Sequence, residues 1–318
     1  MAGENVLVDV EGRQLRLSNL DKVLYPEYGF SKGEVIDYYS RIAPVLLPHL
    51  VDRPVTLRRY PNGVDGMSFY EKNTARHTPD WVRTVTVDTP GSSTGRDSLD
   101  FAIVCDLPTV VWAANLAALE LHIPQWTVGP RGARHNPDRL VFDLDPGAPA
   151  TIVECTRVAL LLREALSADG LECYAKTSGS KGMQLYCAVS TTAPEQTSDY
   201  AKALAERLAG EHDDLVVAKM AKNLRPGKVF IDWSQNNPYK TTVAPYSLRA
   251  RPAPTVSTPI TWAEVEACEQ PQDLVFTADE VLDRVDEHGD LFAGLLRPDP
   301  PKLGGRVTGS AARPRKRR

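Results

Sequence analysis

Leu140-Val-Phe-Asp-Leu-Asp-Pro-Gly147 reads as a short apolar strand that ends at a Pro-Gly turn. Because side chains alternate between the two faces of a strand, Asp143 and Asp145 are expected on the same face. Two neighbouring carboxylates repel each other, and a half-buried pair is stable only beside a cation. A divalent metal ion is one such cation, although Asp-x-Asp before a turn also occurs as the solvated start of a loop. The stretch therefore predicts a strand end and leaves both interpretations of the acids open.

Strands and helices alternate after this stretch. Apolar spacing predicts a long helix from Ile152 that ends at Gly170, followed by strands at Cys173–Thr177 and Met183–Val189. A later strand, Lys228–Trp233, carries a further acid, Asp232. This alternation predicts an α/β or α+β fold built on a central sheet.

The first half of the chain has its own helix and strand signals. Ser31 and Glu34 have the spacing of a capping box ahead of a helix, and strands are expected at Val55–Tyr60 and Val82–Val87. The apolar residues between Pro108 and Leu121 favour a helix that ends just before His122. A lone histidine after a helix is more often structural than functional.

Lys22 and Lys32 flank one predicted turn near the N-terminus. They are close enough in sequence to converge on a single anion, but two solvated lysines are the more common case. The role of this pair therefore depends on what the rest of the chain binds.

The bulk composition indicates a globular protein. The chain has 318 residues, of which 42% are hydrophobic, and it has no apolar run long enough for a membrane span and no signal-peptide pattern. Its five cysteines are scattered, which supports neither a zinc site nor a disulfide framework. A net charge of -4 does not indicate nucleic-acid binding by itself. We therefore expect a cytoplasmic protein with no membrane partner.

A glycine-rich loop joins two of the predicted strands. Gly179 and Gly182 allow backbone N–H groups to approach a triphosphate, while Ser178, Ser180 and Lys181 supply hydroxyl donors and a charge. The loop lacks the Walker A pattern and opens a strand instead of a helix. Together with acids on two strands, it predicts metal-assisted phosphoryl transfer from a nucleotide. Further cations that could face the same pocket are Arg225, Lys228, Arg249 and Arg251.

Three motifs carry a resemblance to a known family. They are Leu140-Val-Phe-Asp-Leu-Asp-Pro-Gly147, Thr177-Ser-Gly-Ser-Lys-Gly182, and Lys228-Val-Phe-Ile-Asp-Trp-Ser-Gln-Asn236 followed by Thr241-Thr-Val-Ala-Pro-Tyr-Ser-Leu-Arg249. The chain resembles the archaeo-eukaryotic primase superfamily, and within it the polymerase domain of the bacterial end-joining ligase D and its stand-alone relatives. The resemblance runs from about Leu17 to Leu296.

The resemblance implies a fold and a set of sites. The fold is α+β: a primase-polymerase core over residues 1–298, with a central mixed or antiparallel, RRM-like sheet flanked by helices and packed against an N-terminal α/β part. Residues 299–318 are expected to form a disordered basic tail. Asp143, Asp145 and Asp232 would hold two divalent ions, Mn²⁺ or Mg²⁺. The positions that match the nucleotide pocket are Arg58, His122, Ser178, Ser180, Lys181, Gln184 and Arg249. The positions that match the pocket for a DNA 5′-phosphate are Lys22 and Lys32.

One residue and one loop depart from the family pattern. Gln184 stands where the family has a histidine that contacts the triphosphate, and glutamine cannot become cationic. The loss of one charge-assisted contact is worth roughly 1.5–3 kcal/mol, which weakens nucleotide binding without abolishing catalysis. The loop from Gly91 to Ser98 also looks longer than is usual, in a region that helps relatives to bring DNA ends together.

The expected function is a DNA repair primase-polymerase. It would add nucleotides, ribonucleotides by family habit, to a primer 3′ end at gapped or broken double-stranded DNA that carries a 5′-phosphate. Its expected partners are nucleoside triphosphates, a separate DNA ligase and a DNA-end-binding protein, on the bacterial nucleoid. One alternative, motivated by Gln184, is a catalytically weakened DNA-end or gap-binding module in non-homologous end joining. A third reading, a dehalogenase-type phosphatase built on Asp143, lacks the threonine that such enzymes need, because Gly147 occupies that position.

Overall fold

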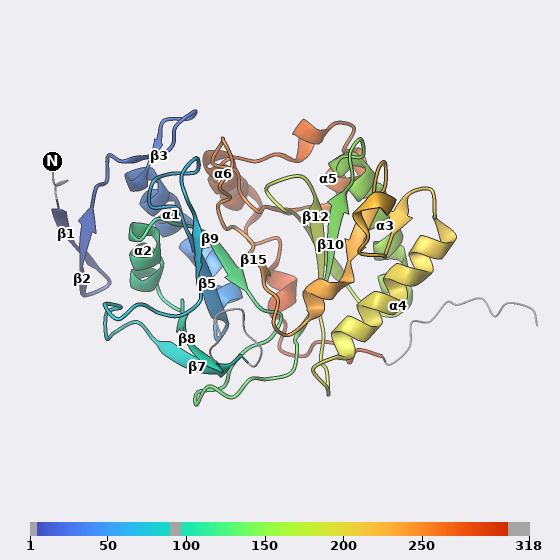
Figure 1. Cartoon of the computed structure of the whole chain (residues 1–318), viewed down its shortest axis with the longest axis horizontal. Coiled ribbons are helices and arrows are strands. Elements are labelled where there is room, and N and C mark those ends of the chain that lie inside the picture. The colour runs from blue at the N-terminus through green and yellow to red at the C-terminus, as the bar shows by residue number, and fades with distance from the viewer. Residues whose placement is uncertain (1–4, 90–96, 305–318) are drawn as a thin grey trace, which may run out of the picture.

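The computed structural model describes residues 5–89 and 97–304. Two large sheets stand side by side in the molecule (Figure 1). The first contains, in sheet order, β13 (Val216–Val217), β14 (Val229–Asp232), β10 (Arg139–Pro146), β12 (Met183–Ala188), β11 (Cys173–Thr177) and β16 (Pro259–Ile260). The second contains β15 (Thr242–Val243), β9 (Ala118–Ile123), β5 (Pro54–Arg59), β8 (Ser98–Ile103) and β7 (Thr84–Asp88), with β6 (Phe69–Glu71) also paired to β5.

The remaining elements surround these sheets. Two ribbons are formed by β1 (Asn5–Val10) with β2 (Arg13–Ser18) and by β3 (Val23–Tyr25) with β4 (Phe30–Ser31). The helices are α1 (Lys32–Leu50), α2 (Leu107–Asn115), α3 (Ile152–Ala168), α4 (Gln196–Glu211), α5 (Trp262–Ala267) and α6 (Ala278–His288). The short 3-10 turns are η1 (Lys222–Leu224), η2 (Trp233–Asn236), η3 (Pro271–Leu274) and η4 (Ala293–Leu296). None of the helices in the described part of the chain is long and apolar enough to cross a membrane.

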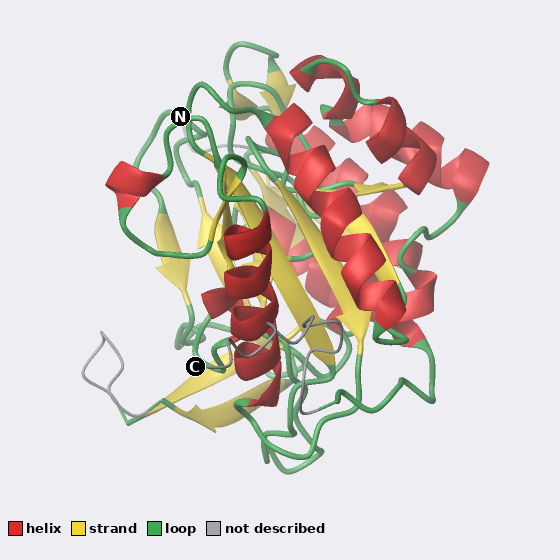
Figure 2. Cartoon of the chain, turned by 90° about the vertical axis from the view of Figure 1, so that its right-hand side faces the viewer, coloured by secondary structure: helices red, strands yellow, loops and turns green. Residues whose placement is uncertain are grey.

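The first sheet separates an apolar face from a polar one. On β10, Leu140, Phe142 and Leu144 are fully buried in a core shared with α3 and α4, which lie against the sheet (Figures 1 and 2). The alternate residues of the strand, Asp143 and Asp145, therefore point to the opposite face, as the sequence predicts. Burial of the apolar residues thus fixes the side on which the two acids emerge.

The capping box predicted at Ser31 is present in the structure, where Ser31 caps α1 with Glu34. Thr261 with Glu264 and Thr277 with Glu280 have the same spacing in the sequence and form capping boxes at the starts of α5 and α6. Each box satisfies backbone N–H groups that would otherwise lack partners at a helix start. These local signals therefore locate helix starts to the residue.

The predicted helix from Pro108 to Leu121 is wrong in its second half. Helix α2 stops at Asn115, Ala117 takes a positive φ of 56°, and Ala118–Ile123 forms strand β9 between β5 and β15. The strand does alternate, with Leu119 and Leu121 on one face and Glu120 on the other, but apolar residues at helical spacing run into it from α2 and masked this short period-two pattern. His122 accordingly lies within a strand and not after a helix.

The fold class is confirmed as α+β. Pairing in both large sheets is antiparallel except between β13 and β14, so the N-terminal part is built on an antiparallel sheet and not on α/β units. Near the C-terminus, Leu303 is buried and its backbone N–H donates to Ser190 O, so the chain packs against the body up to this point. The rest of the predicted basic tail, residues 305–318, and residues 91–96 of the predicted long loop lie outside the described residues.

A buried polar cluster joins the N-terminal and C-terminal parts of the chain. Asp290 accepts hydrogen bonds from Tyr246 Oη at 2.7 Å and pairs with His49 Nε2 at 2.9 Å. Burial works to raise the pKa of Asp290, but the hydrogen bond and charge of His49, together with the hydrogen bonds from Tyr246 and the Phe292 backbone, outweigh it and leave the pKa below its ordinary value. The carboxylate is therefore charged and holds two buried groups from distant parts of the sequence.

Replacing Asp290 by alanine is expected to lower the free energy of unfolding by roughly 3 kcal/mol, because it leaves His49 and Tyr246 without their buried partner. Urea denaturation measures the change. Asp299→Ala is the matched control, since the Asp299 side chain is 83% exposed and its pair with Arg297 is weak. Equal stability of both variants and the wild type would show that the cluster is not stabilising.

Candidate active site

Four polar side chains form a row across the first sheet. Asp143 on β10 lies directly opposite Asp232 on β14 and opposite Gln184 on β12, and Gln184 in turn lies opposite Lys176 on β11. Directly paired residues of antiparallel strands project from the same face. The structure therefore brings the predicted acids together and adds Lys176, which the sequence analysis did not single out.

Asp143 is held by the middle of this row. Gln184 Nε2 donates to Asp143 Oδ1 at 3.0 Å, and Tyr186 Oη donates to Gln184 Oε1 at 3.2 Å, which fixes the orientation of the amide. Burial first, and then the charges of Asp145 and Asp232, raise the pKa of Asp143 to about 7. Burial and Asp232 also raise the pKa of Asp145. The acids therefore repel one another in the absence of a cation.

Asp232 is anchored from the segment that follows it. Its Oδ1 accepts the Ser234 backbone N–H at 3.0 Å, and its Oδ2 accepts Gln235 Nε2 at 3.0 Å. Lys240 Nζ lies 3.9 Å from Oδ2 and donates to the Ser234 hydroxyl. Lys240 is therefore the cation that lies beside Asp232.

The donor set of the three acids fits a hard divalent cation. Carboxylate oxygens are the ligands preferred by Mg²⁺ and Mn²⁺, and such a cation would offset both the burial and the neighbouring charges that raise the pKa of Asp143. Among the described residues, no three acidic, histidine or cysteine groups are yet gathered into one coordination sphere. The carboxylates would therefore have to turn toward a shared ion.

The glycine-rich loop lies beside the acids. Gly182 packs against β10 so closely that an added Cβ would stand 2.0 Å from Leu144 O. Gly179 has a φ of +64°, and Ser178 Oγ accepts the backbone N–H groups of Ser180 and Gly182, each at 3.2 Å. The exposed Lys181 stands at the end of this turn. The loop is thus a compact turn held together by the Ser178 hydroxyl, with the cation of Lys181 exposed at its end.

Two arginines donate hydrogen bonds to the glycine-rich loop. Arg249 Nη1 donates to Ser178 O at 2.7 Å, and Arg251 donates to Ser180 Oγ. Arg225 is close enough to lower the pKa of Asp145, although burial outweighs it. Lys228 instead donates to Asp213 O, away from the acids. Of the four extra cations named from the sequence, three therefore lie at the site and Lys228 does not.

A buried glutamate organises the remaining predicted nucleotide residues. Glu120 on β9 is 1% exposed and pairs with Arg58 at 3.3 Å, His122 at 2.9 Å and Arg249 at 3.3 Å. Burial works to raise the pKa of Glu120, but the hydrogen bond from His122 and the charge of Arg249 hold it well below its ordinary value. Burial lowers the pKa of His122, so its ring is neutral at pH 7. Glu120 therefore links the second sheet to the loop through Arg249.

Sequence reasoning missed Glu120 because it assigned this segment to a helix. In a strand, Glu120 and His122 share a face, so a correct assignment would have placed them together. Tyr70 completes this cluster: its ring meets His122 edge-on at 5.7 Å, and Arg58 stacks on it at 5.1 Å.

Lys22 and Lys32 are adjacent, as predicted, in a part of the molecule away from the acids. Lys22 directly precedes β3 and Lys32 is the first residue of α1, whereas the acids lie on β10 and β14 (Figure 1). Lys22 is exposed, and Lys32 is 5% exposed with its Nζ donating to Ser18 O at 2.6 Å. Burial, followed by the charges of Lys22 and Arg59, lowers the pKa of Lys32 to about 8. Lys22, Lys32 and Arg59 therefore form a cluster of three cations near the start of α1.

The comparisons with known proteins all match LigD or its primase-polymerase domain. The model of a family described as the primase-polymerase domain of LigD matches residues 31–292. The chain is 43% identical over 283 residues to the multifunctional non-homologous end joining protein LigD of Mycolicibacterium smegmatis, covering 89% of this chain and 36% of that protein. It is 32% identical over 287 residues to the bifunctional LigD of Bacillus subtilis, covering 89% of this chain and 44% of that protein. The chain thus spans less than half of the length of these relatives.

A solved structure extends the similarity to the fold. The polymerase domain of Mycobacterium tuberculosis ligase D, in complex with DNA, superposes with a TM-score of 0.83 at 41% sequence identity. The match covers 90% of this chain and 99% of that one. The fold of this chain is therefore that of the polymerase domain over nine-tenths of its length.

Proposed function

Because the chain belongs to the family of LigD primase-polymerase domains, we propose that it is a DNA repair nucleotidyltransferase that extends primer 3′ ends at short gaps and double-strand breaks bearing a 5′-phosphate. The observation that carries this proposal is the row of Asp232, Asp143 and Gln184 beside the loop at Ser178–Gly182. It places acids on two strands next to a turn suited to phosphates, which is what nucleotidyl transfer needs.

The residues have separate roles in this reaction. Asp143, Asp145 and Asp232 would hold two divalent ions, Mn²⁺ or Mg²⁺, which supply charge neutralisation and a lowered pKa for the primer hydroxyl. Ser178, Ser180 and Lys181 bind the triphosphate, supported by Arg249. His122 and Arg58, fixed by Glu120, contact the nucleotide from the second sheet. The reaction is an in-line displacement at the α-phosphate with pyrophosphate as the leaving group, and positioning by these groups is the main contribution of the protein.

Gln184 acts on Asp143 in this account more than on the triphosphate. It is 4% exposed, and its amide N–H donates to Asp143 Oδ1. The absence of the family histidine is therefore compatible with catalysis, because the amide still orients a metal ligand. This favours an active polymerase over the alternative of a DNA-end binding module with weakened catalysis.

Primer extension tests the proposed function. The purified chain is mixed with a gapped duplex, Mn²⁺ and either ribonucleoside or deoxyribonucleoside triphosphates, with and without a 5′-phosphate at the gap. Extension that is faster on the phosphorylated gap is the expected result. Binding to the gap with no extension under any condition would support the binding module instead. The filled gap is a nick with a 5′-phosphate, so the reaction that consumes the product is DNA ligation.

Lys22 and Lys32 are proposed to bind the 5′-phosphate, and this predicts a pH dependence. Lys32 carries its charge below a pKa of about 8 and loses it as the pH rises through that value. The preference for a phosphorylated over an unphosphorylated gap should therefore decline between about pH 7 and pH 9, with a bound phosphate shifting the midpoint upward. Fluorescence anisotropy with the two duplexes measures the preference.

Lys32→Met provides the matched control for this pH dependence. It keeps the aliphatic stem in its buried position and removes the charge, so the preference should fall about tenfold or more at pH 7 and become independent of pH through 8. A preference that is unchanged in the variant would remove Lys32 from the phosphate site. A wild-type preference that is flat from pH 7 to 9 would do the same.

A further inference from the structure

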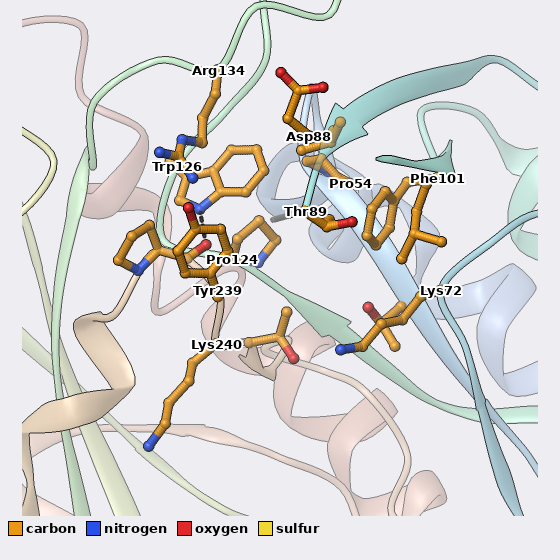
Figure 3. A pocket seen from close by; sticks show the side chains of 15 residues that line it. Pro54, Lys72, Asp88, Thr89, Phe101, Pro124, Trp126, Arg134, Tyr239 and Lys240 are labelled. Carbon is orange, nitrogen blue, oxygen red and sulfur yellow. Dashed lines mark hydrogen bonds between the residues drawn. The ribbon is translucent and has the colours of Figure 1, made fainter. Parts of the chain in front are cut away.

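A cavity of about 270 Å³ lies between the second sheet and the segment that follows η2 (Figure 3). Its walls come from β5, β7 and β8 on one side and from residues 238–241 on the other, with Trp126 and Arg134 contributed by the connection after β9. None of these residues belongs to the nucleotide cluster around Glu120. The cavity is therefore separate from the groups already given a role, apart from Lys240, which lies on its wall.

Aromatic side chains and a guanidinium form one wall. Trp126 is buried and its indole N–H donates to Pro238 O at 2.8 Å, so the ring is held in place. Arg134 stacks on Trp126 at 5.4 Å and on Tyr239 at 5.6 Å, and the three are grouped on one side of the cavity, with Phe101 on the other (Figure 3). Tyr239 is 54% exposed despite its size. This wall offers flat faces to a planar ligand.

The polar groups of the cavity favour an anionic or hydrogen-bonding ligand. Lys72, Arg134 and Lys240 line it, against a single acid, Asp88. Thr56 also lines it, and its buried hydroxyl has no hydrogen-bond partner within the described ranges. Aromatic faces combined with several cations are the composition of sites that bind single nucleotides of a nucleic-acid strand.

The cavity adjoins the acids on the side away from the phosphate loop. Lys240 on its wall is 3.9 Å from Asp232, and Thr56 is the cross-strand partner of His122. In the sheet order β14-β10-β12-β11, Asp232 lies on one side of Asp143 and the loop between β11 and β12 lies on the other. An in-line displacement needs the attacking hydroxyl and the leaving pyrophosphate on opposite sides of the phosphorus. If the loop holds the triphosphate, the hydroxyl must approach from the cavity side.

We propose that this cavity binds the 3′-terminal nucleoside of the strand that is extended, with its base against Tyr239 and Trp126 and its phosphate near Lys72 and Arg134. This rests on the proposed function, since it assumes that a primer hydroxyl is the nucleophile. It assigns a binding role to residues outside the acids and the loop. It also explains why an aromatic ring as large as that of Tyr239 stays half exposed beside the site.

A binding cycle without catalysis tests the proposal. The affinity of the protein for a gapped duplex is measured by anisotropy, with either a normal nucleotide or an abasic residue at the primer 3′ terminus. The wild type should bind the normal end about tenfold more tightly, because stacking of one base on an aromatic side chain has an effect of this size. Tyr239→Ala should lose most of that preference, and Tyr239→Phe, which keeps the ring, should retain it.

The outcomes of this cycle are distinguishable from failure of the proposed function. Moving the abasic residue two nucleotides inward serves as the substrate control, for which wild type and Tyr239→Ala should respond equally. Equal affinity of the wild type for normal and abasic ends, or a full preference in Tyr239→Ala, would overturn the proposal. The binding measurements need no added nucleotide or metal, so they are independent of catalysis. If the protein extended no primer but Tyr239→Ala still lost the preference for the normal end, the proposed polymerase function would be wrong and the nucleoside site would remain supported.

Discussion

Replacing Asp143 by asparagine is expected to reduce primer extension at least about a thousandfold while the affinity for gapped DNA stays within about twofold of the wild type. Asparagine has the same shape and can still accept the hydrogen bond from Gln184, but it lacks the charge that a divalent cation needs. The loss corresponds to several kcal/mol of transition-state stabilisation, the amount that metal-ion catalysis supplies. Single-turnover extension and anisotropy measure the two quantities.

Stability supplies the internal control for this variant. The folded-state pKa of Asp143 is raised to about 7, so ionisation of this group destabilises the metal-free protein increasingly from about pH 4 to pH 7, and fully above. Asp143→Asn removes that cost, and its thermal midpoint at pH 8 without metal should equal or exceed that of the wild type. Near-normal extension by a stably folded variant would refute the assignment of Asp143 as a metal ligand.

Replacing Gly182 by alanine is expected to be almost as damaging as loss of an acid. The new Cβ would lie 2.0 Å from Leu144 O and 3.2 Å from Pro146 Cδ, both in the strand that carries Asp143 and Asp145. Backbone cannot yield by that amount without opening the pairing of β10 with β12. Because the loop and the acids would both shift, extension should fall at least about a hundredfold, with a raised KM for the nucleotide.

Gly210→Ala is the matched control for this change. Gly210 lies in α4, where an added Cβ meets nothing within 4 Å, so activity should be unchanged and stability should rise by about 0.5–1 kcal/mol. If Gly182→Ala retained wild-type kinetics, the close packing of the loop on β10 would have no bearing on nucleotide binding. Nucleotide titrations at saturating DNA separate KM from kcat in both variants.

Much of the first sheet could be predicted because its signals are local. The run from Leu140 to Gly147 alternates between apolar residues that meet α3 and α4 and acids that face away, and this pattern alone places Asp143 and Asp145 on one face. Capping boxes at Ser31, Thr261 and Thr277 likewise depend on residues three positions apart. Interactions within a few residues are readable without knowledge of the fold.

The residues that the sequence analysis missed depend on contacts between distant segments. Glu120 acquires its role from Arg58 and Arg249, which are 62 and 129 positions away, and Lys176 from its place in a row that spans four strands. Lys176 is completely buried and donates to Ser257 Oγ. A lysine in a predicted strand gives no sign of this burial. Pairing between distant strands, which a single sequence does not reveal, gives Glu120 and Lys176 their positions in the site.

Gln184 shows how the structure changes the meaning of a departure from the family pattern. The sequence alone predicts that Gln184 contacts the triphosphate more weakly than the family histidine would. In the structure its two ends connect Tyr186 to Asp143, so it belongs to the acids. The hydrogen bond from Gln184 also lowers the pKa of Asp143, although burial outweighs it. A glutamine at this position is therefore suited to hold a charged metal ligand.

Anomalous diffraction at the manganese edge, from crystals soaked with Mn²⁺ and a nucleoside triphosphate, tests the central claim most directly. The claim is that Asp143, Asp145 and Asp232 form the metal site at which a nucleotide bound to the Ser178–Gly182 loop reacts. The predicted result is anomalous density among the three carboxylates, in contact with the phosphates of a nucleotide held by Lys181 and Ser178. Manganese bound elsewhere, or a triphosphate away from this loop in a protein that extends primers, would contradict it.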